Sequence, residues 1–235
     1  LGIGLLTPWR KGEPKKVSAS ARLPLILSAL VTSLAWLLGA RSPWIIITLF
    51  LCGFPFFVML LEVIHLSKTR SPFQLLADNP RRYGGFVSHL GALLLVLGVA
   101  FSSIYETDRE VTLKKGESTN VENYTLTFHE IVTRQAPQRF EVKALVFVER
   151  NGKLLGEMSP QMNYYSNSRE PIATPAIRSN LLRDFYLTLI QVEEDGSEAS
   201  LRVIAAPAVA WIWIGGLVVM LGGMLALAVG RKKEI

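Results

Sequence analysis

Four long apolar blocks are the feature of this sequence that most limits what it can fold into. They cover about residues 23–40, 44–65, 83–104 and 207–229. About 20 apolar residues in a helix span roughly 30 Å, which is the thickness of the hydrocarbon core of a bilayer. We therefore predict an integral membrane protein in which the four blocks are transmembrane helices.

The stretch between the third and fourth blocks, 105–206, has the composition of β-strands. Asn151-Gly152 and Asp195-Gly196 are typical of hairpin turns. Three prolines and few periodic apolar residues predict a long ordered loop over 159–183. Six segments are rich in Val, Thr, Tyr, Phe and Leu and partly alternate, and we predict strands at 109–115, 122–132, 139–150, 153–158, 185–193 and 200–205.

These patterns predict one fold class and three parts of the chain. The fold is an integral membrane α-helical protein with four transmembrane helices and an extracytoplasmic β-rich domain inserted between helices three and four. Residues 1–104 form an N-terminal cytoplasmic segment and the first three helices. Residues 105–206 form the outer β domain, and residues 207–235 form the fourth helix and a cytoplasmic tail.

The distribution of charge predicts the topology. The chain has a net charge of +6, but residues 105–206 hold 12 Lys and Arg against 15 Asp and Glu, which argues against a nucleic-acid-binding face. The positive-inside rule places both termini and the 66–82 loop in the cytoplasm, and 105–206 outside. The basic residues that flank the helices are Arg10, Lys11, Lys15, Lys16, Arg22, Lys68, Arg70, Arg81, Arg82, Arg231, Lys232 and Lys233.

The N-terminal segment and the cysteine content exclude several classes. Residues 1–9 have no basic start and no small-residue cleavage site, so we predict no cleavable signal. They resemble the tail of a helix, and we expect the chain to be a fragment or one half of a split protein. Cys52 is the only cysteine and no CxxC or CxxCH motif occurs, which argues against a thiol oxidoreductase or a covalent c-type haem carrier.

His89 is the only histidine deep inside an apolar block. An ionisable side chain in hydrocarbon is costly and is a hypothesis of function by default. Gly85 and Ala92 stand four residues before and three after it, so small side chains leave a flat slot on its helix face. We interpret His89 as a ligand of haem or of a metal, with Arg81 and Arg82 as contacts for haem propionates. The alternative is a helix-packing motif in which the histidine donates a hydrogen bond to a neighbouring helix.

The other two histidines are weaker candidates. Glu62 and His65 form a Glu-x-x-His pattern, but the second copy that a di-iron site needs is missing. His65 is also about 10 Å shallower than His89 at helical rise, which argues against a shared iron. His129 stands in a predicted strand and is interpreted as a surface residue.

An ordered set of motifs resembles a known family. It begins with Arg81-Arg82-Tyr83-Gly84-Gly85 and His89-Leu90-Gly91, and continues after the β region with Arg183-Asp184-Phe185-Tyr186. It ends with Trp211-Ile212-Trp213-Ile214-Gly215-Gly216 and Gly222-Gly223. In this order the motifs resemble the C-terminal part of the CcmF family, the haem lyase component of cytochrome c maturation.

The resemblance implies a specific role for His89. In the family, the matching histidine is an axial ligand of a membrane b haem, which is thought to pass electrons to the substrate haem that is delivered transiently for attachment. The other axial ligand, the tryptophan-rich segment and the two outer catalytic histidines belong to the family's N-terminal part, and this sequence has no match to them. We therefore expect a component of a haem lyase complex that supplies one haem ligand and no catalytic residue.

The resemblance also implies partners and a location. The partners are the N-terminal half of the same protein or a split partner, the haem chaperone CcmE, a CcmH-type subunit that binds apocytochrome, and apocytochrome c itself. The location is the bacterial inner membrane, with residues 105–206 in the periplasm. Two alternatives stay open: a haem-handling protein of the ResB type, and a non-catalytic, membrane-anchored assembly module.

Overall fold

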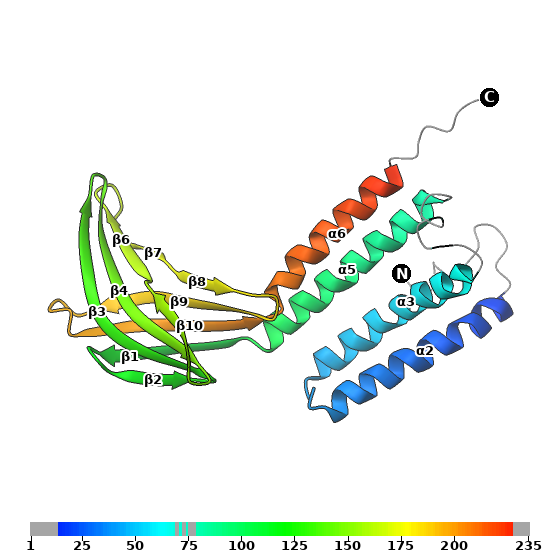
Figure 1. Cartoon of the computed structure of the whole chain (residues 1–235), viewed down its shortest axis with the longest axis horizontal. Helices are drawn as coiled ribbons and strands as arrows, with labels where there is room; N and C mark the ends of the chain where they lie inside the picture. The colour runs from blue at the N-terminus through cyan, green and yellow to red at the C-terminus, as the bar shows by residue number, and fades with distance from the viewer. Residues whose placement is uncertain (1–13, 69–70, 72–73, 75–78, 228–235) are drawn as a thin grey trace. The chain divides into compact units, whose positions relative to one another are not determined.

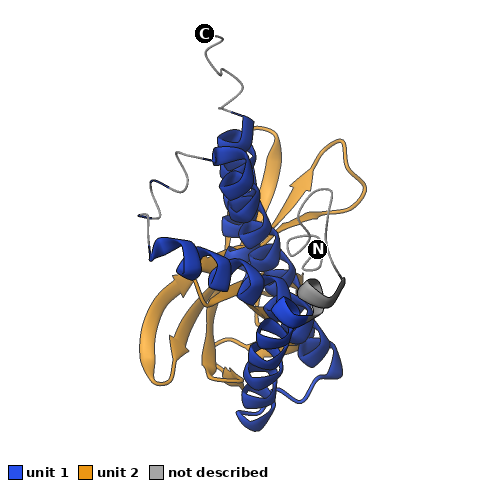
Figure 2. Cartoon of the chain, turned by 90° about the vertical axis from the view of Figure 1, so that its right-hand side faces the viewer, with its two compact units in different colours: residues 1–104, 208–235 blue, residues 105–207 orange. Residues whose placement is uncertain are grey.

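The computed structural model describes residues 14–68, 71, 74 and 79–227. Of residues 14–18 only the helical backbone is described. The chain divides into two compact units (Figure 2), Leu1–Ile104 with Ala208–Ile235, and Tyr105–Pro207. Several basic residues used to predict the topology lie outside the described residues, namely Arg10, Lys11, Arg70, Arg231, Lys232 and Lys233.

The first unit consists of helices, in agreement with the apolar blocks. They are α2 (Pro14–Leu37), α3 (Pro43–Ser67), α5 (Pro80–Ile104) and α6 (Val209–Leu227). Within the described residues, four helices are long and apolar enough to cross a membrane. Helix α5 begins at Pro80, where its missing N–H costs nothing. The carbonyl of Asn79 accepts hydrogen bonds from the N–H groups of Arg82 and Tyr83, both at 3.1 Å.

Small and apolar side chains hold α3 between its neighbours. The Ser28 hydroxyl of α2 donates to the Phe50 carbonyl of α3 at 2.7 Å, and a Cβ added at Gly53 would lie 2.6 Å from the Ser28 Oγ. Helices α3 and α5 share a buried apolar cluster of Cys52, Met59, Phe86 and Leu93. Because lipid provides no hydrophobic drive between helices, close packing of this kind is what holds them together.

The second unit is a β-sandwich. One sheet has the order β1–β10–β9–β8, and the other has the order β2–β3–β4–β6–β7, with β5 also paired to β4 (Figure 1). Alternate residues of the long strands point inward and fill the core, with Phe128, Leu126, Val146, Leu187 and Leu201 fully buried. The strands are β1 (Thr107–Lys114), β2 (Ser118–Val121), β3 (Tyr124–Ala136), β4 (Arg139–Arg150), β5 (Lys153–Met158), β6 (Gln161–Tyr165), β7 (Ile172–Thr174), β8 (Ala176–Ser179), β9 (Arg183–Val192) and β10 (Glu198–Pro207).

The hairpin predictions are confirmed. Asn151 and Gly152 have φ angles of 49° and 75° and join β4 to β5, with Arg150 paired to Lys153. A two-residue turn with positive φ at both positions matches the right-handed twist of the strands that it joins. The turn at Gly196, with a φ of 70°, joins β9 to β10.

The predicted loop over 159–183 is wrong, because the segment contains three short strands. The buried Pro160 separates β5 from β6, yet its carbonyl accepts a hydrogen bond of 3.0 Å from the Ala144 N–H of β4. β4 therefore pairs with β5 along one half and with β6 along the other. Pro175 lies between β7 and β8, where the chain leaves one sheet and enters the other. Prolines fit here because each stands at a strand end, where no ladder N–H is needed.

The outer side of β5 is an edge of its sheet. Gly156 has a φ of 116°, and the register shifts between Val148 and Glu149 of the paired strand β4. Arg178, which belongs to β8 of the other sheet, donates a hydrogen bond to the Leu155 carbonyl. The edge is thus distorted at a glycine and capped by a guanidinium.

Candidate functional site

Helices α5 and α6 pack backbone against backbone along a row of glycines. A Cβ added at Gly91 would lie 2.5 Å from the Val219 amide nitrogen and 2.6 Å from the Gly215 carbonyl oxygen. Gly84 and Gly98 stand seven residues on either side of Gly91 and face α6 in the same way. Only glycine permits this approach, and the Ser88 hydroxyl adds a hydrogen bond to the Val219 carbonyl at 3.2 Å.

Gly85 is the exception among the glycines of α5. A Cβ added there would meet nothing within 4 Å. The helical period places Gly85, His89, Ala92 and Val96 on one face, about 100° away from the row that contacts α6. The side chains of His89 and Ala92 are part-exposed, and Val96 is exposed. We call this surface the Gly85–Val96 face.

The His89 imidazole is available for a ligand. Among the described residues it has no hydrogen bond or ion pair, and no group of three or more His, Cys, Asp or Glu side chains has the arrangement of a metal site. At about 1.5 Å per residue, His89 lies roughly 14 Å along the helix from Pro80, near the middle of the span. A part-exposed imidazole beside an open glycine position has the donor atom and the space that a planar iron macrocycle needs, so the residues fit a haem.

The two arginines at the start of α5 differ in their partners. Arg82 donates a hydrogen bond to Glu62 of α3 and forms an ion pair with it. The Arg82 side chain remains 51% exposed, so part of its guanidinium stays accessible. Arg81 is exposed and has no ion pair within the described part of the chain. Both lie at the end of α5 to which the Gly85–Val96 face extends.

The sequence motif around His89 therefore divides between two faces. Ser88 and Gly91 belong to the α6 interface, whereas Gly85 and Ala92 remain beside His89. The pair of Glu62 and Arg82 is missed by sequence reasoning, because its members stand on different helices. The signal for the packing row is the seven-residue spacing of Gly84, Gly91 and Gly98, which matches Gly215 and Gly222 of α6.

The remaining histidines lie apart from this face. His65 is exposed in the last turn of α3. His129 is exposed on β3 at a register shift, and its ring packs edge-on against Phe147, with centroids 5.7 Å apart. The position of His129 agrees with its interpretation as a surface residue.

Comparison with known proteins gives a consistent family. The family model described as the CcmF C-terminal beta-sandwich matches residues 104–207. The cytochrome c-type biogenesis protein CcmF of Escherichia coli is 29% identical over 240 residues, which is 100% of this chain and 36% of that protein. The CcmF protein of Haemophilus influenzae is 28% identical over 238 residues, with 97% and 36% covered.

A solved structure agrees over nearly the whole chain. The structure called Cytochrome c Heme Lyase CcmF superimposes with a TM-score of 0.75 at 29% identity, and covers 96% of this chain and 37% of that one. The chain thus spans about a third of the length of the relatives that it matches. The sandwich matches the CcmF C-terminal family, and the relatives and the solved structure match over nearly the whole chain, so the chain is similar throughout to the C-terminal part of the CcmF proteins.

Proposed function

We propose that this chain supplies His89 as one axial ligand of a membrane b haem, and acts in the covalent attachment of haem to apocytochrome c. The observation that carries the proposal is the Gly85–Val96 face, where an imidazole with no hydrogen bond or ion pair among the described residues stands beside the glycine of α5 that α6 leaves open. Relatives named cytochrome c-type biogenesis proteins, and a structure named as a haem lyase, support the same chemistry.

The described residues around His89 have separate tasks in this proposal. A neutral imidazole nitrogen coordinates iron. Gly85 and Ala92 leave room for the flat ring beside the helix, and Arg81 and Arg82 bind the propionates by charge-assisted hydrogen bonds. The bound haem supplies electrons for the haem that is being attached. The residues of this chain hold and orient it and exclude lipid from one side.

The rest of the machinery comes from outside this chain. The second axial ligand and the outer histidines that attach haem belong to the part of the relatives that this chain does not span, supplied by an N-terminal half or a split partner. CcmE delivers the substrate haem, and a CcmH-type subunit presents apocytochrome c. The location is the bacterial inner membrane. The short basic flanks favour cytoplasmic termini and a periplasmic sandwich.

A haem-content measurement tests the proposal. The chain is purified after co-expression with the N-terminal part of a CcmF protein, and b haem is determined from the pyridine haemochrome spectrum. We expect a His89→Gly variant to lose the b haem and to regain its spectrum when imidazole is added. His65→Gly is the matched control and should retain haem. Full haem content in His89→Gly would contradict the proposal.

A further inference from the structure

The sandwich has an open cleft at the end opposite Arg183 and Pro207, the pair that closes the β9–β10 ladder. β3 and β4 are 13 and 12 residues long, whereas β9 and β10 have 10 residues each, so the long hairpin of one sheet is longer than that of the other. In Figure 1 the β3–β4 and β9–β10 hairpins diverge toward their tips. The cleft between them has a volume of about 510 Å³. We call it the end cleft, and its lining includes Ile131, Thr133, Phe140, Val142, Tyr164, Val192 and the turn 193–196.

The floor of the end cleft is apolar and aromatic. Phe140 and Tyr164 are cross-strand partners on β4 and β6, and their ring centroids lie 6.3 Å apart. They remain 39% and 44% exposed. Val142 and Ile131 join this floor to the buried core. Such an exposed continuation of a core costs hydrophobic free energy that an occupant would recover.

The wall of the end cleft is acidic. Glu193, Glu194 and Asp195 are all exposed, and none of them forms an ion pair within the described part of the chain. Hydrogen bonds from Ser197 lower the pKa of Asp195, so its carboxylate is charged at neutral pH. The turn is held by hydrogen bonds from the Gly196 N–H to the Glu193 carbonyl at 2.9 Å and from the Glu193 N–H to the Glu198 carbonyl at 3.0 Å. The wall is therefore ordered and negatively charged.

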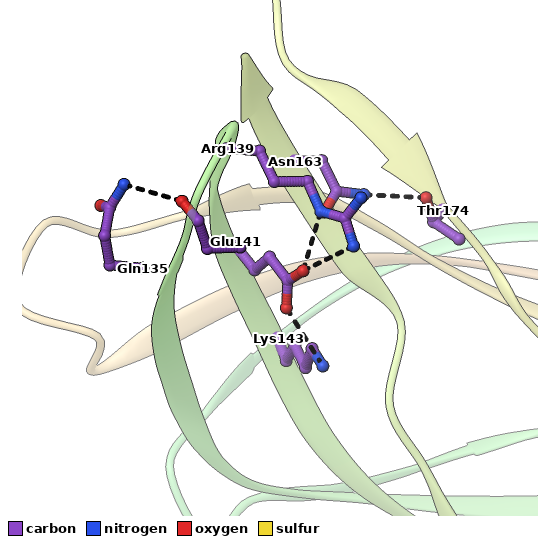
Figure 3. A network of polar contacts seen from close by, with 7 residues as sticks. Gln135, Arg139, Glu141, Lys143, Asn163 and Thr174 are labelled. Carbon is purple, nitrogen blue, oxygen red and sulfur yellow. Dashed lines mark hydrogen bonds and ion pairs between the residues drawn. The ribbon is translucent and has the colours of Figure 1, made fainter. Parts of the chain in front are cut away.

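A polar network braces the reverse side of the floor (Figure 3). Glu141 points away from the cleft and is only 4% exposed, yet Arg139 donates to its carboxylate at 2.8 Å and Lys143 lies 3.4 Å from it. On the neighbouring strand, Asn163 donates to Thr174 at 2.9 Å. β4 and β6 are thus fixed behind Phe140 and Tyr164, and the floor is formed before anything binds.

We propose that the end cleft binds a short extended segment of a partner protein that carries apolar side chains flanked by lysine or arginine. The aromatic floor takes the apolar side chains, and the exposed carboxylates of the wall take the basic ones. Charge decides the class of occupant. An anionic lipid headgroup or a nucleic acid would meet three like charges.

Peptide binding to the whole chain tests this. The chain is held in nanodiscs of zwitterionic lipid, and the probe is a short fluorescein-labelled peptide that alternates lysine with leucine, followed by fluorescence anisotropy. We expect Glu193→Gln with Glu194→Gln to weaken binding roughly fivefold, because two exposed ion pairs are lost, and added salt to weaken the unsubstituted chain in the same direction. The matched control is Glu157→Gln with Glu170→Gln, which removes the same charge at exposed positions on β5 and after β6.

The apolar half of the proposal has its own pair of variants. Tyr164→Ser should weaken binding of the same peptide, whereas Phe147→Ser, which removes a 36% exposed ring from the opposite face of the sheet, should not. A peptide with glutamate in place of lysine should not bind. Equal binding of the two peptides, or equal loss in the cleft and control variants, would overturn the proposal. A dimer of the chain that dissociates on Tyr164→Ser substitution would also overturn the proposal, since the occupant of the end cleft would then be a second copy of the chain.

Discussion

Glu62 of α3 and Arg82 of α5 form an ion pair that joins two helices of the membrane unit. The Glu62 side chain is 20% exposed and the Arg82 side chain 51% exposed. An arginine has five N–H donors, and one carboxylate uses at most two of them. Arg82 is thus oriented by Glu62 and retains donors for a second carboxylate.

Substitutions of this pair should separate helix packing from haem binding. Because the pair is part-exposed, a double-mutant cycle of Glu62→Gln and Arg82→Ala should give a coupling of about 0.2–1 kcal/mol in thermal unfolding. Haem content should fall in Arg82→Ala and change little in Glu62→Gln, which leaves the guanidinium in place. An equal loss of haem in both variants would assign Arg82 to helix packing alone.

A bulky side chain at Gly85 should block the Gly85–Val96 face without unfolding the chain. A Cβ there meets nothing within 4 Å, so Gly85→Leu has space in the isolated chain but fills the slot beside His89. We expect loss of b haem with an unchanged melting temperature. Gly216→Leu is the control, since Gly216 on α6 is equally open. The haemochrome spectrum and the thermal melt are read on the same samples.

Two adjacent glycines of α6 should differ sharply in their tolerance. A Cβ at Gly222 would lie 2.6 Å from the Gly84 carbonyl oxygen, whereas one at Gly223 meets nothing within 4 Å. Gly222→Leu should therefore destabilise the helix pair by about 1–3 kcal/mol or more, as overpacking does. Gly223→Leu should behave like the unsubstituted chain. Midpoints of thermal aggregation in detergent measure the difference, and equal midpoints would contradict the packing of α5 on α6.

Acid should loosen the sandwich through Glu141. The hydrogen bond from Arg139 lowers the pKa of this carboxyl below its ordinary 4.5; burial opposes the shift, and Lys143 adds to it. Because the pKa of Glu141 is lowered in the folded state, its carboxylate stabilises the fold above about pH 4.5. This contribution is lost as the pH falls through the lowered pKa. Protection factors of the β4 amides, taken relative to the intrinsic exchange rate at each pH, should therefore fall below pH 4.5, and less steeply in Glu141→Gln. Glu149→Gln, on the same strand, is the control, and an identical slope in Glu141→Gln would refute the role of Glu141.

Much of the fold follows from periodicity alone. The apolar blocks predict four helices because no other pattern fills 20 residues, and β4 and β5 begin and end at the predicted residues because Asn151-Gly152 fixes the turn between them. The failure over 159–183 has a physical reason. β6, β7 and β8 are five, three and four residues long, so each is too short to show alternation. They are defined by their ladder partners, which are β4 for β6, β6 for β7 and β9 for β8.

The site is predictable only in part. A histidine inside an apolar run is visible in sequence, and its role as a haem ligand stays a prediction. The helical period separates the row of Gly84 and Gly91 from Gly85, but which of the two faces α6 depends on the partner helix. Glu62 and Arg82 are 20 residues apart on different helices, so no local pattern connects them.

The distorted edge at β5 affects what the sandwich can join. Free strand edges recruit further strands, which leads to aggregation or to unintended partners. On β5 the bend at Gly156 and the occupied Leu155 carbonyl remove the regular row of donors and acceptors that an incoming strand would need. The sandwich thus has one edge closed to indiscriminate strand addition, and selective binding is left to side-chain surfaces.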